Sequence, residues 1–65
     1  MMHSREIIRR LEADGWFHVG TEGDHRQFRH PTKSGKVTVV HPAGDIKIKT
    51  LRSIEKQSGV QLRTR

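Results

Sequence analysis

Two histidines, an aspartate and two arginines lie within the stretch GDHRQFRHP, which runs from Gly23 to Pro31. The four residues that separate His25 from His30 resemble half of a zinc-finger pattern. In a strand, however, side chains five positions apart point to opposite faces of the sheet. The chain also has no cysteine that could complete a zinc site. We therefore expect no metal site in this stretch.

General base catalysis is a second chemistry open to His25. Gly23 lies two positions earlier in a turn, where a glycine lets the backbone approach a ligand closely. An imidazole can take the proton of a ribose 2′-hydroxyl, while Arg26 and Arg29 could hold the phosphate. A surface histidine without a role is the alternative, and the pattern alone favours it, because polar strand faces commonly carry such residues. Whether Asp24 tunes His25 or only closes the turn stays open.

Positive charge is the strongest signal in the composition. Thirteen Lys and Arg residues face seven Asp and Glu residues, which gives a formal net charge of +6. A small domain with this much positive charge is expected to attract polyanions, above all nucleic acid. Lys47, Lys49 and Arg52 cluster near the start of the last predicted helix, where free N–H groups already favour phosphate. The sequence favours a phosphate-binding site and a merely solvated helix face equally for this cluster.

The elements that must position these residues follow the order helix, three strands, helix. Ser4 is a suitable N-cap, and Gly15 and Gly59 suit helix ends. Hydrophobic spacing and turn residues predict helices over 5–14 and about 47–58, and strands over 16–21, 25–30 and 36–41. Short connections imply a three-stranded antiparallel sheet with both helices on one face. This α+β arrangement is that of a double-stranded-RNA-binding domain.

The register of the first hairpin decides which side chains face RNA. Pairing Phe17 with Phe28 would bury both rings together with Val19, since a slip of one residue would expose them. In that register His25 and Arg29 point to the open face of the sheet.

The remaining histidines have weaker claims to function. In the same register His18 shares the open face with His25 and is a candidate second acid or base. His30 and His41 each precede a proline and are expected to hydrogen-bond turns. A base-stacking surface is not expected, because the core needs at least two of the three aromatic residues, Trp16, Phe17 and Phe28.

The length and composition limit the class of protein. A chain of 65 residues is expected to form a single domain over 1–65, with a small core that a partner could help to stabilise. The chain lacks the apolar runs of a signal peptide or a membrane span, so no membrane association is expected. The absence of cysteine fits a reducing cytoplasm.

Three segments together carry a family resemblance. In this order they read LEADGW, GDHRQFRHPTKSGKVTVVHP and TLRSIEKQSGV. They resemble the HicA toxins of HicA–HicB toxin–antitoxin systems, over roughly residues 4–60. The resemblance implies a double-stranded-RNA-binding-like fold and a ribosome-independent endoribonuclease that cleaves mRNA without metal or organic cofactor. It also implies a HicB-like antitoxin that covers the active site. The essential histidine of the family falls on His25, and Gly23 matches the glycine two positions before it.

Three departures from the family pattern are visible. Relatives often carry a basic residue in place of Glu22, a proline and a glycine in place of Lys47 and Lys49, and a proline in place of Val40. None of these changes touches Gly23 or His25. The Glu22 departure leaves the rate and the RNA affinity open.

We therefore expect a toxin that cleaves mRNA in the cytoplasm, with His25 as general base. The RNA-binding candidates are Gly23, Arg26, Arg29, Lys47, Lys49 and Arg52. Two alternatives share the fold: a non-catalytic RNA-binding module, and an inactivated toxin that only binds its HicB antitoxin.

Overall fold

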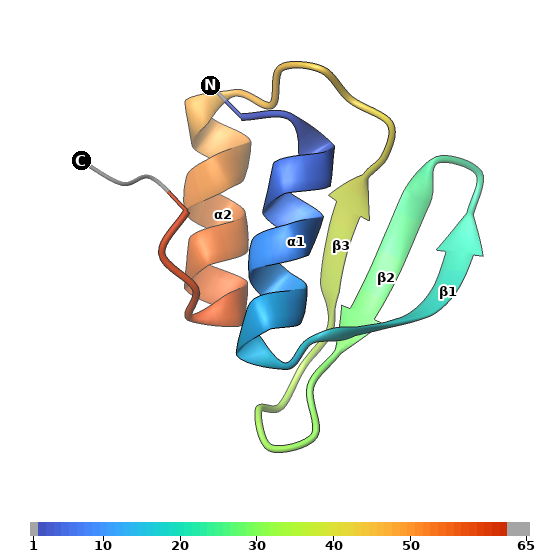
Figure 1. The fold of residues 1–65 in the computed structure, drawn as a ribbon, viewed down its shortest axis with the longest axis vertical. Coiled ribbons are helices and arrows are strands. Elements are labelled where there is room, and N and C mark those ends of the chain that lie inside the picture. The colour runs from blue at the N-terminus through green and yellow to red at the C-terminus, as the bar shows by residue number, and fades with distance from the viewer. Residues whose placement is uncertain (1, 63–65) are drawn as a thin grey trace.

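The computed structural model describes residues 2–62 and has the predicted order of elements (Figure 1). Two helices enclose three strands in the sequence: α1 Ser4–Asp14, β1 Phe17–Glu22, β2 His25–Arg29, β3 Val37–Val40 and α2 Ile48–Ser58. Every boundary lies within one residue of its expected position. Among residues 2–62, no helix is long and apolar enough to cross a membrane.

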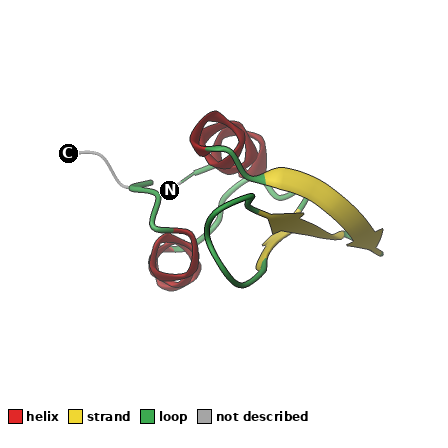
Figure 2. Cartoon of the chain, turned by 90° about the horizontal axis from the view of Figure 1, so that it is seen from below, coloured by secondary structure: helices red, strands yellow, loops and turns green. Residues whose placement is uncertain are grey.

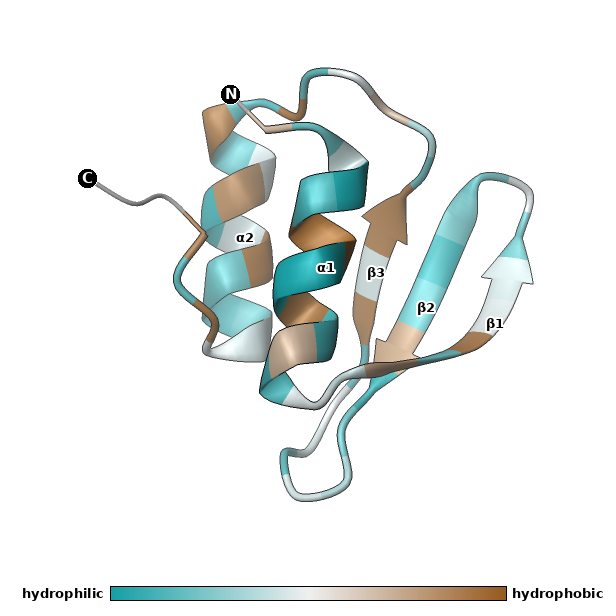
Figure 3. Cartoon of the chain, in the orientation of Figure 1, coloured by the Kyte–Doolittle hydropathy of each residue, from teal (hydrophilic) through white to brown (hydrophobic). Residues whose placement is uncertain are grey.

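The strands form one antiparallel sheet in the order β1-β2-β3. The helices lie side by side next to β3, and β1 and β2 project away from them (Figure 1). Figure 2 shows the same arrangement from below. Figure 3 shows hydrophobic residues on the helices and β3, whereas most of β2 is hydrophilic. The core therefore joins the helices to the β3 side of the sheet; its buried residues are Ile7, Leu11, Trp16, Phe28, Val37, Val39, Ile46, Leu51, Ile54 and Leu62.

The start of α1 differs from the sequence-based prediction. The N-cap is His3, whose Nδ1 accepts a hydrogen bond of 3.0 Å from the Arg5 N–H, and not Ser4. Ser4 is fully buried in the first turn, and its Oγ lies 2.7 Å from His41 Nδ1. The same Oγ accepts a 2.9 Å hydrogen bond from the Ala43 N–H. A buried hydroxyl needs hydrogen-bond partners, and Ser4 finds both of them in the segment after β3. The hydroxyl therefore joins α1 to that segment.

His30 fixes the C-terminal end of α1 to the segment after β2. Its Nδ1 accepts hydrogen bonds from the backbone N–H groups of Thr32 and Lys33, at 3.1 and 3.2 Å. Nδ1 is therefore unprotonated, and Nε2–H donates to the Asp14 carbonyl at 2.8 Å. Gly15 adopts a φ of +112°, and a Cβ there would lie 2.8 Å from this Nε2. His30 is thus a structural residue of the turn, as its sequence position predicts.

Lys33 reinforces the same end of the molecule. Its Nζ lies 2.7 Å from Asp14 Oδ2 at the end of α1 and 3.0 Å from the Ser58 carbonyl at the end of α2. The hydrogen bond from Lys33 lowers the pKa of the Asp14 carboxyl below its usual value. One cation therefore links the C-terminal ends of both helices, where the helix dipoles favour positive charge.

The predicted register of the first hairpin is wrong by one residue. Phe17 pairs with Arg29, and His18 pairs with Phe28. The register shifts between His18 and Gly20, which makes Val19 an extra residue in β1. Phe17 and Val19 are each 48% exposed, instead of buried.

Trp16 takes the core position that the prediction gave to Phe17. It directly follows the end of α1, is only 2% exposed, and meets His30 edge to face with ring centroids 5.2 Å apart. His18 lies on the same side of the sheet as Phe28, with ring centroids 5.6 Å apart. His18 therefore does not share a face with His25, contrary to the prediction.

Leu62 completes the core after the end of α2. Its side chain is 1% exposed, its N–H donates to Glu55 Oε2 at 2.8 Å, and its carbonyl accepts from Arg10 Nη1 at 3.2 Å. This segment packs against both helices and is an integral part of the fold.

Candidate functional site

One end of the molecule gathers the chemically interesting segments. The β1–β2 turn, the end of β3 and the N-terminal ends of both helices all lie at this end (Figure 1). The His30 and Lys33 contacts lie at the other end. His25 begins β2 and therefore stands beside the turn, at the same end of the molecule as the N-terminal ends of both helices.

The side chain of His25 is accessible and has an acidic neighbour. It is 56% exposed, and its Nδ1 lies 3.2 Å from Asp24 Oδ1. A carboxylate that accepts from Nδ1–H leaves the lone pair on Nε2. Across the sheet His25 pairs with Glu22 on one side and Val40 on the other. His25 thus presents an unhindered imidazole on the open face, as predicted.

Gly23 shapes the turn before His25. Its φ of +62° lies in the left-handed region, which disfavours other residues, while Asp24 has a negative φ. This combination suits a two-residue type II′ hairpin turn. A Cβ at Gly23 would meet nothing within 4 Å, so the space beside the turn is open. The glycine is therefore required for its backbone conformation and not because a side chain would clash.

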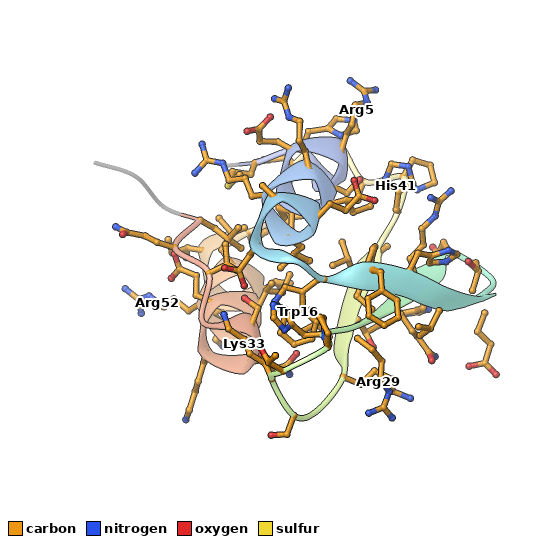
Figure 4. All side chains as sticks on the ribbon, turned by 60° about the horizontal axis from the view of Figure 1, so that its bottom comes forward. Arg5, Trp16, Arg29, Lys33, His41 and Arg52 are labelled. Carbon is orange, nitrogen blue, oxygen red and sulfur yellow. The ribbon has the colours of Figure 1, made fainter. Side chains whose placement is uncertain are left out.

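The basic residues chosen from the sequence do not converge on His25. Arg29 shares its face but lies four residues along β2, about 13 Å away at the usual rise of a strand. Arg26 points to the opposite face, where its cross-strand partner Val39 is buried. Figure 4 places Arg29 and Arg52 on different sides of the molecule.

The basic residues of α2 form a separate group. Lys47 is the N-cap residue of this helix and makes no capping hydrogen bond with its side chain. Lys49 and Arg52 follow within the first turn and a half, and all three residues are exposed. The structure therefore brings them together with each other and with the N-terminal end of α2.

A groove that the sequence reading missed lies between α1 and the sheet. It has a volume of about 320 Å³ and is lined by Arg5, Ile8, Arg9, Glu12, Arg26 and His41. Figure 4 shows Arg5 and His41 close together beside α1. The spacing of four between Arg5 and Arg9 is a signal that could have revealed a basic face on this helix.

His41 is held at the end of this groove. Its backbone N–H donates to the Asp24 carbonyl at 2.7 Å, and Ser4 binds its Nδ1. Burial, followed by the positive charges of Arg26, His3 and Arg5, lowers the pKa of His41 below its usual value. The imidazole therefore favours the neutral form.

Among residues 2–62, no group of three or more His, Asp or Glu side chains is arranged to hold a metal ion.

Comparisons with known proteins agree with the fold. The family model described as the HicA toxin of bacterial toxin–antitoxin systems matches residues 4–60. The chain belongs to the HicA toxin family. A chain of the solved HicA3 and HicB3 toxin–antitoxin complex is 32% identical to it, with a TM-score of 0.84. That match covers 95% of this HicA chain and 100% of the solved one. No curated protein matches the sequence.

Proposed function

We propose that this HicA chain is a metal-independent endoribonuclease that cleaves mRNA in the cytoplasm, with His25 as general base. The observation that carries the proposal is the exposed His25 imidazole, with the Asp24 carboxylate 3.2 Å from Nδ1. Asp24 orients the ring and keeps the proton on Nδ1, so that Nε2 is the basic atom. Family membership supports the assignment.

The proposed reaction uses the 2′-hydroxyl of RNA as nucleophile. Nε2 of His25 takes its proton, the 2′-oxygen attacks the adjacent phosphorus, and the 5′-oxygen leaves. The products are a 2′,3′-cyclic phosphate and a 5′-hydroxyl end. DNA lacks the nucleophile and is not a substrate. Water protonates the leaving oxygen in this scheme, because His18 lies on the other side of the sheet and binds Thr21 Oγ1 at 2.7 Å.

Basic residues of β2 and α2 are proposed to bind the RNA chain on either side of His25. Arg29 lies on the same open face, and the α2 group lies at the same end of the molecule as the turn. Gly23 leaves room for the backbone of the RNA beside His25. The full proposed set is Gly23, Arg26, Arg29, Lys47, Lys49 and Arg52.

A HicB-like antitoxin is the proposed protein partner. The similar solved structure is a toxin–antitoxin complex. Three large hydrophobic side chains are exposed on the sheet, Phe17, Val19 and Val40, at 48%, 48% and 37%. Val40 pairs directly with His25, so a partner that covers these residues would also cover the catalytic imidazole.

The test is expression of the chain with and without a HicB-like antitoxin. The parent chain should arrest growth and cleave RNA when expressed alone, and the antitoxin should relieve both effects. His25→Ala should lower the cleavage rate by about 10²- to 10⁴-fold, the usual contribution of a general base. Asp24→Asn should lower it less, because the imidazole itself remains.

His18→Ala is the matched control, since it removes another exposed histidine of the same hairpin, and it should cleave like the parent. An RNA with a 2′-deoxy substitution at the cleaved position should be bound but left intact. Cleavage of that RNA, or full activity of His25→Ala, would contradict the mechanism. Binding of unmodified RNA without any cleavage by the parent would instead identify a non-catalytic RNA-binding module.

A further inference from the structure

The groove between α1 and the sheet combines charge with hydrogen-bond donors that nothing in the described protein uses. It is lined by Arg5, Ile8 and Arg9 of α1, by Glu12 one turn further on, and by Arg26 and His41 from the other wall. Three arginines face one glutamate, so the groove carries net positive charge. Ile8 is the one apolar lining residue, which leaves no hydrophobic stripe on which a partner helix could dock.

Two of the three arginines are not neutralised within residues 2–62. The guanidinium group of Arg9 forms an ion pair with Glu6. No ion pair or side-chain hydrogen bond holds Arg5 or Arg26 in this part of the chain. Each guanidinium group can donate two parallel N–H hydrogen bonds to two oxygens of a phosphate group. Arginine therefore recognises a phosphate more specifically than lysine does.

His41 adds a neutral donor to the same groove. The Ser4 hydroxyl is fully buried and already accepts from the Ala43 N–H, so within residues 2–62 its own proton has an acceptor only in His41 Nδ1. That hydrogen bond puts the imidazole proton on Nε2, the other ring nitrogen. His41 therefore offers an N–H to the groove that it lines.

The groove lies next to the proposed catalytic residue. Arg26 directly follows His25 in β2, and the His41 N–H binds the Asp24 carbonyl at 2.7 Å. The two sites are on opposite faces of the sheet, separated by its end at the β1–β2 turn. An RNA strand that passes over this end, where a Cβ at Gly23 would meet nothing within 4 Å, would reach both sites.

We propose that this groove is a second phosphate site, which binds a backbone phosphate of the RNA outside the scissile one through Arg5, Arg26 and His41. The inference rests on the proposed ribonuclease function and extends it. A groove of about 320 Å³ has room for one phosphate and its sugar, and Ile8 provides an apolar contact for the sugar. The groove would fix the direction of the strand that crosses His25.

The experiment measures RNA binding in the non-cleaving His25→Ala protein, so that binding is scored independently of cleavage. The dissociation constant for a short single-stranded RNA is measured over a range of salt concentrations, with and without the added pair Arg5→Gln and Arg26→Gln. Loss of two phosphate contacts should weaken binding about tenfold or more. The slope of log K against log salt should fall by about 1.4, since each contact contributes roughly 0.7 with single strands.

The control pair is Lys36→Gln and Lys56→Gln, which removes the same charge from the opposite end of the molecule. This control pair should leave the slope of log K against log salt within about 0.3 of the value for His25→Ala alone. That is well below the change of about 0.7 that the loss of one phosphate contact would cause. Arg26→Lys is a second variant, which keeps the positive charge but loses the paired N–H donors of the guanidinium group. It should weaken RNA binding with little change in the salt dependence. Its circular dichroism spectrum should match that of the parent.

Three results bear directly on the site. If the Arg5/Arg26 pair binds RNA with the affinity and slope of the control pair, the groove is not a phosphate site. If that pair loses affinity for the antitoxin alone, the groove belongs to the protein interface and the proposal is overturned. If the parent binds RNA through the groove yet never cleaves it, the ribonuclease assignment fails while the phosphate site stands.

Discussion

At the scale of single residues, Ser4 shows how one buried hydroxyl can hold two elements together. It receives a hydrogen bond from the Ala43 N–H and binds His41 Nδ1, so it links the first turn of α1 to the segment after β3. The sequence predicted only a helix cap at this position, because Ser is common there and a partner 37 residues away is not visible in a local pattern. The buried contact replaces the cap, which His3 supplies.

The Ser4→Ala variant tests this link. The substitution leaves the Ala43 N–H without an acceptor in a buried site, so the free energy of unfolding should fall by about 1–3 kcal/mol. Urea denaturation followed by circular dichroism measures the change. Ser53→Ala, on the exposed face of α2, is the control and should stay within about 0.5 kcal/mol of the parent. Equal stability of the two variants would show that the Ser4 hydroxyl contributes nothing.

At the scale of elements, the sequence predicted all five helices and strands but not how the first two strands pair. Turn glycines and hydrophobic spacing are local signals, and they placed every boundary within one residue. The register depends on the core, where Trp16 fills the space next to His30, and on the extra residue Val19 in β1. An alternating strand pattern fits either register, so only the packed core distinguishes them.

Two phenylalanine variants discriminate between the registers. Phe28→Ala removes a ring that is 1% exposed and should lower the free energy of unfolding by about 3–5 kcal/mol. Phe17→Ala removes a ring that is 48% exposed and should cost less than about 1 kcal/mol. Thermal denaturation of both proteins under the same conditions measures the difference. Comparable losses for the two variants would favour the pairing of Phe17 with Phe28.

The same division between local and long-range signals applies to the candidate site. The glycine turn and the open face of β2 were predictable, because both follow from the pattern around Gly23 and His25. The opposite orientations of Arg26 and Arg29 also follow from the period of a strand. The groove was not predictable, since α1, β2 and the segment at His41 meet there only in the folded chain.

At the scale of the whole molecule, the proposed site and the contacts of His30 and Lys33 lie at opposite ends. His25, the basic groove and the N-terminal ends of both helices lie at one end (Figure 1). Lys33 and His30 hold the other end through Asp14 and Ser58. Mutations at Lys33 should therefore change stability without changing the proposed cleavage activity.

Lys33→Met tests this separation. The variant should be less stable than the parent at neutral pH but should cleave RNA at the parental rate. Because Lys33 lowers the pKa of Asp14 in the folded chain, that contribution is complete above the usual aspartate pKa of 3.8 and is lost as the pH falls through the lowered value. The stability difference between parent and variant should therefore narrow in acid. A part should remain, because the hydrogen bond to the Ser58 carbonyl does not titrate.

Denaturation curves at several pH values, together with the RNA cleavage assay, provide the measurement. Lys36→Met is the control, because Lys36 is exposed just before β3 and has no side-chain partner among residues 2–62. A constant stability difference across the acid range, or a loss of cleavage in Lys33→Met, would argue against the separation.

The burial of Leu62 has a consequence for when the chain can fold during its synthesis. This residue is almost completely buried and is bound by both Arg10 and Glu55, so the core is incomplete until residue 62 has joined it. Leu51 and Ile54, in the last third of the described chain, belong to the same core. During synthesis, the core that supports β2 and His25 therefore stays incomplete until residue 62 has left the ribosomal tunnel.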